Sequence, residues 1–239
     1  MTIRSMERRT VEGGGSLVEQ AVQAVRGHIR SNDLKVGDTL PGEGQFAADL
    51  GVSRAVMREA FGALAALRLI DVGNGRRPRV GAIDGSVIGT SLDHAVATSQ
   101  ISVAEVWDVR RTVEVRIAAL AAEKRSDFQA DQILALSESM ARANGDMEQI
   151  TAFDTAFHQI IAAASGNFLF MQIVRSFEPQ MEFAVPRAWE TRQTEEEKAA
   201  ILILHHRIAQ AIADRNPEGA AAAMTGHFDA SIGDLLLHG

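Results

Sequence analysis

The histidines in the second half of the chain have a spacing that suits metal coordination. Asp154 and His158 are four residues apart in the stretch FDTAFHQII, so on a helix they would share one face. His205, His206 and His227 follow later in the chain. Three neutral imidazoles and one carboxylate suit Zn²⁺, Ni²⁺ or Mn²⁺, and they leave coordination positions open for a ligand. The residue types alone do not choose between His205 and His206.

The surroundings of this pair bear on whether it binds a metal, because a lone Asp-x3-His pair is more often a surface hydrogen bond. Apolar residues flank it at helical spacing and favour a place inside a helical bundle: Phe153, Phe157, Ile160 and Ile161. A carboxylate buried there is costly without a partner. Two other uses of a metal stay open. One is a metallohydrolase that activates water, although no general base is evident, and the other is a purely structural ion that joins helices.

A second group of residues, between positions 40 and 69, could contact DNA. The stretch LPGEGQFAADLGVSRAVMREAFGALAALRL predicts a short helix from Glu43 to Leu50, a turn at Gly51, and a second helix with Ser53 as its N-cap. Arg54 and Arg58 lie four apart on one side of that second helix. The other side carries a core stripe formed by Val56, Ala60, Phe61, Leu64 and Leu67. This arrangement is typical of a helix-turn-helix that places its second helix in the major groove.

A basic hairpin follows the helix pair. In LIDVGNGRRPRVG, two short apolar pieces flank the turn at 73–75 and predict a β-hairpin. Arg76, Arg77 and Arg79 would make it a wing that contacts phosphates or the minor groove, although a surface hairpin with chance arginines is the alternative. With an amphipathic helix over 17–29, these elements predict a winged helix. Its expected DNA-binding residues are Glu43, Ser53, Arg54, Ala55, Arg58, Asn74, Gly75 and Arg76.

The rest of the chain has a helical pattern. Six candidate helices are separated by breakers such as Asn144-Gly145 and Asn216-Pro217, and they span Val103–Arg125, Phe128–Ala143, Met147–Ser165, Phe168–Trp189, Glu195–Arg215 and Pro217–Leu237. We therefore predict a mainly α protein with an N-terminal winged helix-turn-helix and a C-terminal antiparallel all-α bundle. The expected divisions are a mobile arm at 1–15, the winged helix at 16–81, a linker at 82–100 and the helical domain at 101–239.

Composition and charge limit the class of protein. The 239 residues are 46% hydrophobic and include no cysteine, which excludes disulfides and thiolate metal ligands. Residues 1–80 hold 12 lysines and arginines against 9 acidic residues, whereas residues 81–239 hold 12 against 22. This asymmetry indicates a modestly basic nucleic-acid module joined to an acidic module with another task. No signal peptide and no apolar run near 18 residues is found, so we expect a cytoplasmic protein with no membrane partner.

The motifs together resemble a known family of regulators. Residues 16–80 are similar to the winged helix of GntR-family transcription regulators, whose pattern resembles LPSERELAxxLGVSRxxVREA. The matching residues are Leu40, Pro41, Glu43, Phe46, Ala47, Leu50, Gly51, Val52, Ser53, Arg54, Met57, Arg58, Glu59 and Ala60. Residues 101–238 resemble the FCD ligand-binding domain of the FadR-type subfamily. There the matching pieces are VRRTVE (109–114), FDTAFH (153–158), GN (166–167), and a histidine-led pattern that runs through AI (211–212) and NP (216–217) to His227.

The resemblance implies a role for several residues of the helical domain. In the family, the third metal ligand stands at a fixed spacing before Ala-Ile and before the fourth ligand, which are Ala211-Ile212 and His227 here. His205 has this spacing, whereas His206 is one position out of phase. The implied metal set is Asp154, His158, His205 and His227, with zinc expected first and nickel or manganese as alternatives. Arg110 matches the arginine that faces the effector's carboxylate in relatives. Its alternative is a helix-surface ion pair with Glu114 at i+4.

The chain also departs from the family pattern. Gly42 and Gly44 stand where the family has Ser and Arg, so the first helix of the pair should lack its side-chain cap and one DNA-contacting arginine. DNA contact should then depend on Arg54, Arg58 and the wing.

As a whole, the sequence predicts a homodimeric repressor that binds palindromic operator DNA and is no enzyme. A small carboxylate or hydroxy-acid effector, bound at the metal, would control its affinity for the operator. A loose likeness of residues 176–189 to regulators of sugar-acid use suggests a sugar acid such as galactonate or gluconate.

Overall fold

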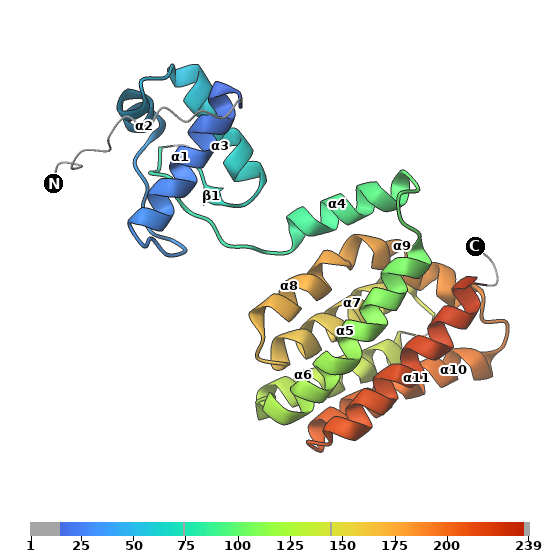
Figure 1. Ribbon diagram of the computed structural model, residues 1–239. Coiled ribbons are helices and arrows are strands. Elements are labelled where there is room, and N and C mark those ends of the chain that lie inside the picture. The colour runs from blue at the N-terminus through green and yellow to red at the C-terminus, as the bar shows by residue number, and fades with distance from the viewer. Residues whose placement is uncertain (1–14, 74, 144, 237–239) are drawn as a thin grey trace. The chain divides into compact units, whose positions relative to one another are not determined.

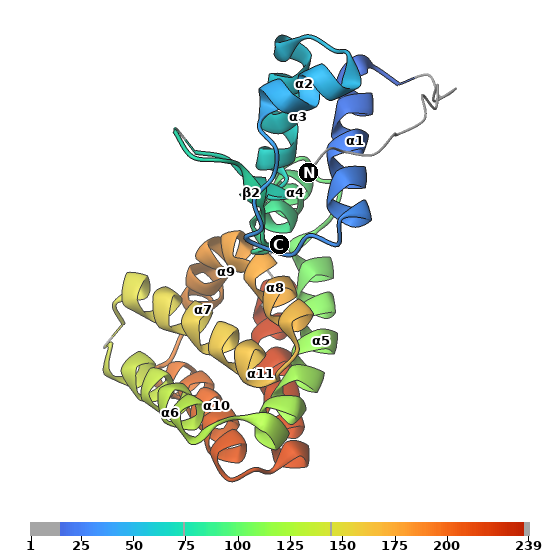
Figure 2. The same ribbon diagram turned by 90° about the vertical axis from the view of Figure 1, so that its left-hand side faces the viewer.

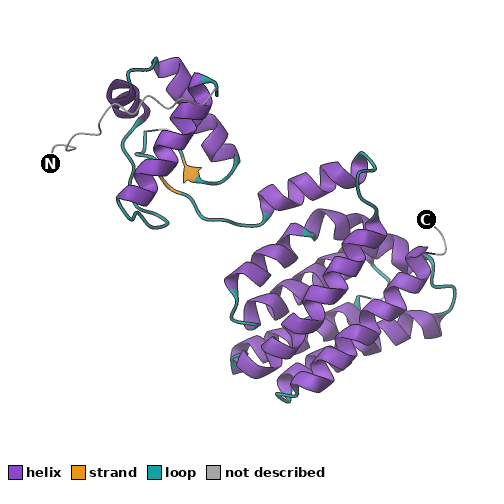
Figure 3. Ribbon diagram, viewed as in Figure 1, coloured by secondary structure: helices purple, strands orange, loops and turns teal. Residues whose placement is uncertain are grey.

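The structure is a computed structural model that describes residues 15–73, 75–143 and 145–236, and it is almost wholly helical (Figures 1 and 3). The chain divides into two compact units, at 1–83 and 84–239. The described residues contain a single pair of short strands, and all other regular elements are α-helices. The prediction of a mainly α protein is confirmed. None of the described helices is long and apolar enough to cross a membrane.

The first unit is three helices and a small antiparallel sheet. Its elements are α1 (Leu17–Ser31), α2 (Glu43–Leu50), α3 (Arg54–Ala66), β1 (Ile70–Asp71) and β2 (Arg79–Val80). Helix α1 begins at a capping box, in which Ser16 and Glu19 each satisfy the other's backbone amide. Gly51 has a left-handed conformation (φ 67°) that ends α2 and turns the chain toward α3. The fully buried core between these helices includes Val25, Met57 and Leu64.

The core of this unit differs from the predicted stripe at two positions. Ala60, Phe61 and Leu64 are buried as expected, whereas Leu67 is 50% exposed. Helix α3 ends at Ala66, so Leu67 no longer follows its helical face. Met57 is fully buried on that face and was absent from the predicted stripe.

The second unit is an antiparallel helical bundle. Its elements are α4 (Ser86–Ala97), α5 (Val103–Lys124), α6 (Asp127–Arg142), α7 (Met147–Ala164), α8 (Phe168–Ser176), α9 (Glu178–Glu190), α10 (Glu195–Ala213) and α11 (Pro217–Leu236). Helix α11 packs along α5 and α10, and α6 packs against both α7 and α10 (Figures 1 and 2). Capping boxes begin three of the long helices, at Ser102, Ser126 and Thr194. The long helices surround one apolar core that includes Phe157 and Phe228.

The segment at 82–100, expected to be a linker, instead contains helix α4, which packs against α8 and α9. Its glycines, which suggested flexibility, serve close packing. A Cβ on Gly89 would lie 3.1 Å from the Ser176 carbonyl oxygen, and Gly85 has a positive φ of 81° and lies against the backbone of Gln172. The linker prediction was wrong because close approach and flexibility both use glycine.

The predicted helix Phe168–Trp189 is two helices. Phe177 ends α8 and precedes α9. Pro179 occupies the first turn of α9, where its missing amide hydrogen costs nothing, but without that hydrogen it cannot continue the backbone hydrogen bonds of α8. The break between α8 and α9 therefore follows from a proline that the helical periodicity concealed.

Candidate metal and DNA-binding sites

Three helices of the bundle bring the four expected metal-binding side chains together. Asp154 and His158 lie on α7, His205 on α10 and His227 on α11, and each is less than 10% exposed. One ring nitrogen from each of the three histidines lies within 4.8 Å of the others. Residues 154 and 227 are far apart in sequence, so only the packing of α10 and α11 on the bundle creates this cluster.

The hydrogen bonds of His205 fix which of its nitrogens faces the cluster. Nδ1 lies 2.9 Å from the Ile201 carbonyl oxygen, which only accepts, so Nδ1 carries the proton. In the neutral ring, Nε2 then presents a lone pair, and it lies 2.9 Å from Oδ1 of Asp154. Two acceptors at this distance need a cation between or beside them, either a proton or a metal ion.

The other two histidines have ring nitrogens with no partner. Nε2 of His158 and Nδ1 of His227 are buried and have no hydrogen bond among the described residues. Leaving a buried polar atom unpaired costs about 1–3 kcal/mol. Orphaned imidazole nitrogens beside a carboxylate are the donor set that a divalent transition metal uses, so the residues fit such an ion.

A buried ion pair lies behind the cluster. Glu114 on α5 receives a hydrogen bond from Nε of Arg110 at 2.8 Å through Oε1, and its Oε2 contacts Nδ1 of His158. Arg110 and Glu114 are only 2% and 1% exposed. The sequence alternative of an ion pair at i+4 is therefore present, but it lies inside the bundle and not on its surface.

Burial and charge set the protonation of this region. Burial acts to raise the pKa of Asp154, but the close contact with Nε2 of His205 and the nearby imidazoles outweigh burial and hold that pKa well below its usual range. Burial likewise acts to raise the pKa of Glu114, but the interactions with Arg110 and His158 outweigh burial and lower that pKa. Burial lowers the pKa of His227 well below 6.5, and repulsion from His205 and His158 adds to this. The site thus favours carboxylates and a neutral His227, the forms that bind metals.

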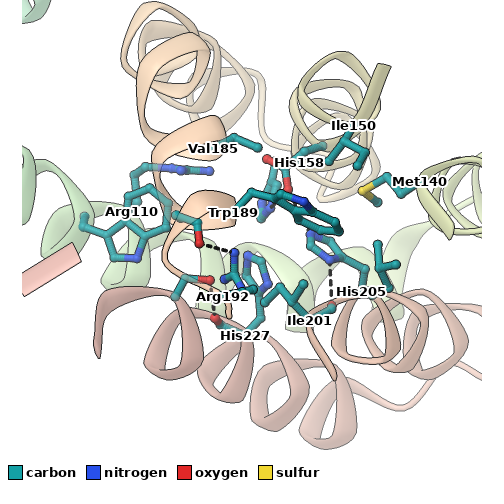
Figure 4. A pocket seen from close by; sticks show the side chains of 15 residues that line it. Arg110, Met140, Ile150, His158, Val185, Trp189, Arg192, Ile201, His205 and His227 are labelled. Carbon is teal, nitrogen blue, oxygen red and sulfur yellow. Dashed lines mark hydrogen bonds and ion pairs between the residues drawn. The ribbon is translucent and has the colours of Figure 1, made fainter. Parts of the chain in front are cut away.

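A pocket of about 460 Å³, counting the part open to solvent, lies over the cluster (Figure 4). Its walls combine eight apolar side chains with seven polar or charged ones, so the pocket could hold a small polar molecule. Both tryptophans of the chain line it. The full lining is Trp107, Arg110, Met140, Ile150, Asp154, His158, Val185, Ala188, Trp189, Arg192, Ile201, Leu202, His205, His227 and Ser231.

Several of these residues were missed by sequence reasoning. Arg192, between α9 and α10, is 9% exposed and donates to the Ala188 carbonyl oxygen, and nothing in its sequence context indicated a buried arginine. Glu114 was noticed only as a surface partner of Arg110. The indole Nε1 of Trp107 is buried with no partner among the described residues, so it is available to an acceptor on a ligand.

The two adjacent histidines of α10 lie in different environments. His205 is 4% exposed and belongs to the cluster. His206 is exposed, and its Nδ1 lies 3.4 Å from Oγ of Ser137. One residue along a helix turns the side chain by about 100°, which separates the two roles.

The expected DNA-contacting face of α3 is open. Arg54, Ala55 and Arg58 are exposed on the side of α3 away from its buried residues. The hydroxyl of Ser53 accepts from the amide of Val56, so Ser53 caps α3. Helix α2 has no side-chain cap at Gly42, as the departure from the family pattern predicts.

Glu43, half-buried at the start of α2, is expected to contact DNA, and its carboxylate also lies near an arginine of α3. Its Oε2 lies 3.8 Å from Nε of Arg58, and this loose pair connects the two helices.

The predicted wing forms a very short β-hairpin. β1 and β2 pair antiparallel, with Ile70 opposite Val80. Gly75 and Arg76 are exposed at the turn, and Asn74 lies outside the described residues. Arg79 donates to the Gly37 carbonyl oxygen at 2.7 Å, so it fixes the hairpin to the preceding loop.

Known proteins share this architecture. The model of bacterial regulatory proteins of the gntR family matches residues 17–80, and the FCD domain model matches residues 105–230. The HTH-type transcriptional regulator LutR of Bacillus subtilis is 30% identical over 213 residues, which are 87% of this chain and 95% of LutR. The HTH-type transcriptional repressor NanR of Cronobacter sakazakii is 27% identical over 230 residues, 95% of this chain and 87% of NanR.

A solved structure also matches across both units. The Streptococcus agalactiae GntR structure covers 90% of this chain and 98% of its own, with a TM-score of 0.64 and 25% identity. The family models cover the winged helix and most of the bundle, and the relatives extend over nearly their whole length. The chain therefore belongs to the GntR family of bacterial transcription regulators, with a winged helix-turn-helix followed by an FCD domain.

Proposed function

We propose that this regulator is a homodimeric repressor whose affinity for operator DNA is controlled by a small carboxylate bound with a divalent metal in the bundle pocket. The observation that carries the proposal is the cluster of His158, His205, His227 and Asp154 beneath a pocket, on the same chain as an open winged helix. The relative NanR is a transcriptional repressor, which supports the direction of control proposed for this chain.

The DNA-binding part of the proposal depends on α3 and the wing. Two recognition helices, one from each copy, would enter successive major grooves of a palindromic site. Arg54 and Arg58 would contact guanine edges or phosphates, and Arg76 would contact DNA from the wing; the exposure of all three side chains supports this. Ser53 supports this face by capping α3.

In the bundle, Asp154, His158, His205 and His227 would hold the metal, most favourably zinc, with nickel and manganese as alternatives. A bound divalent ion supplies positive charge and open coordination positions to a carboxylate or hydroxy-acid. Arg110 lines the same pocket, and we propose that its guanidinium adds attraction for the acid. A sugar acid is the finer proposal, and the Nε1–H of Trp107 is available to donate a hydrogen bond to one of its hydroxyl oxygens.

Thermal unfolding with a set of acids tests the effector claim. Zinc-loaded protein is heated with gluconate, galactonate, lactate and acetate, and one of the hydroxy-acids should raise the melting temperature in a concentration-dependent way. The His158→Ala variant, which removes a ligand from the cluster, should lose that rise. No stabilisation by any hydroxy-acid, or an equal rise in the variant, would contradict the proposal.

The same experiment separates the competing functions. Consumption of a stabilising acid over time would favour the metallohydrolase, since a sensor returns its ligand unchanged. Stabilisation by zinc with no response to any acid would favour a purely structural ion.

A further inference from the structure

We propose that Glu114 is the positioning residue of the metal site: it holds the ring of His158 and strengthens that histidine as a ligand. The inference depends on the proposed metal site and adds a residue that the four-ligand set does not contain. It begins from a contact between helices far apart in sequence, since Glu114 on α5 reaches His158 on α7.

The two oxygens of Glu114 are already in use. Oε1 accepts from Nε of Arg110 at 2.8 Å, and Oε2 contacts Nδ1 of His158. Because a carboxylate beside Arg110 is ionised, it can only accept, so Nδ1 of His158 carries the proton. Glu114 is therefore engaged as a partner of a ligand and is not a member of the three-histidine cluster.

This hydrogen bond decides which nitrogen of His158 is free. With the proton on Nδ1, the lone pair is on Nε2, and Nε2 is the buried atom with no partner among the described residues. It lies 4.0 Å from Oδ1 of Asp154, the carboxylate that also meets His205. A carboxylate accepting from the far side of an imidazole raises the basicity of the ligating nitrogen and fixes its tautomer.

Arg110 holds Glu114 in turn. Its guanidinium carbon lies 4.9 Å from the ring centre of Trp107 and 5.4 Å from that of Phe228, and Nη1 contacts Sδ of Met181. These contacts restrict the arginine on several sides within the bundle core. The aromatic rings therefore hold Arg110, Arg110 holds Glu114, and Glu114 holds His158 with its unpaired Nε2 toward the cluster.

Metal affinity measured on purified full-length protein tests the proposal. Glu114→Gln keeps the size of the side chain and an acceptor oxygen but removes the charge, so Zn²⁺ affinity should fall about 10-fold, within the 10- to 100-fold range of such partners. Glu123→Gln, an exposed position on the same helix, is the matched control and should bind as wild type does. A competing zinc-chelating dye reports the dissociation constants.

A second measurement keeps the test decisive if the fold is affected. In metal-free protein, ¹⁵N spectra of the histidine rings should show His158 as the Nδ1–H tautomer in wild type and a mixture in Glu114→Gln. Unchanged zinc affinity in folded Glu114→Gln would overturn the proposal, even if its melting temperature fell, because the residue would then be structural only. Wild type that binds no zinc would also overturn it, together with the metal site. Wild type that binds zinc equally well with His158 in the Nε2–H form would overturn the positioning role alone.

Discussion

The adjacent histidines of α10 give a matched pair for testing the metal site. His205→Ala removes a buried ring that faces Asp154, whereas His206→Ala removes an exposed ring one position along the same helix. At a free zinc concentration of about 100 times the dissociation constant, binding stabilises the folded state by about 2.7 kcal/mol. In a unit the size of residues 84–239, each kcal/mol shifts the melting temperature by about 2–4 °C, so wild type should gain roughly 5–11 °C.

The two variants should respond differently to the same zinc concentration. Loss of a ligand should cost at least as much as loss of a residue that supports one, about 100-fold, which leaves at most about 0.4 kcal/mol of stabilisation, or roughly 1–2 °C, in His205→Ala. His206→Ala should keep the wild-type gain. The assay is differential scanning calorimetry of each protein with zinc and with EDTA, so that any cost of the substitution itself cancels. An equal zinc-dependent gain in both variants would refute the assignment of His205.

The remaining predictions concern DNA and pH. Arg54→Ala and Arg58→Ala should each weaken binding to DNA from beside the protein's own gene. Where the lost contact is to a phosphate, the slope of log affinity against log salt concentration should also become shallower by about 1. Fluorescence anisotropy measures both, and unchanged slopes and affinities would exclude α3 as the contact face. In metal-free protein, the free energy of unfolding should fall as pH drops below 6.5, because unfolded His227 takes up a proton that the buried ring refuses. It should fall further below about 4.5, because the carboxyl groups of Glu114 and Asp154 then take up protons in the unfolded chain while the fold keeps them ionised. Urea unfolding at several pH values checks this, and a flat profile between pH 6.5 and 4.5 would show that His227 is solvated in the fold.

Local patterns predicted most of the fold because local chemistry determines it. The helix pair of the winged helix has a glycine at its turn and a serine cap at Ser53, and both features act within a few residues. The break at Phe177 was missed, since Pro179 removes a backbone hydrogen bond without interrupting the apolar periodicity. Helix α4 was missed for a different reason: its glycines fit against the α8–α9 corner, a contact that only the tertiary structure contains.

The sequence indicated which side chains would cluster in the bundle, but not the residues that surround them. The i, i+4 spacing of Asp154 and His158 places them on one face of any helix, so their proximity needed no tertiary information. The choice of His205 over His206 required the family's spacing. In the structure His205 is buried and His206 is exposed, as that spacing implies. Glu114 is 44 residues from His158, and no local pattern connects them.

Operator affinity of the zinc-loaded protein, measured with and without the acid that stabilises it, tests the central claim most directly. Footprinting and anisotropy on DNA from beside its own gene should show protection of a palindromic site, and the affinity should fall when the acid is added. The His158→Ala variant should bind the site with or without the acid. Equal operator affinity with and without the acid in the wild-type protein would contradict effector control.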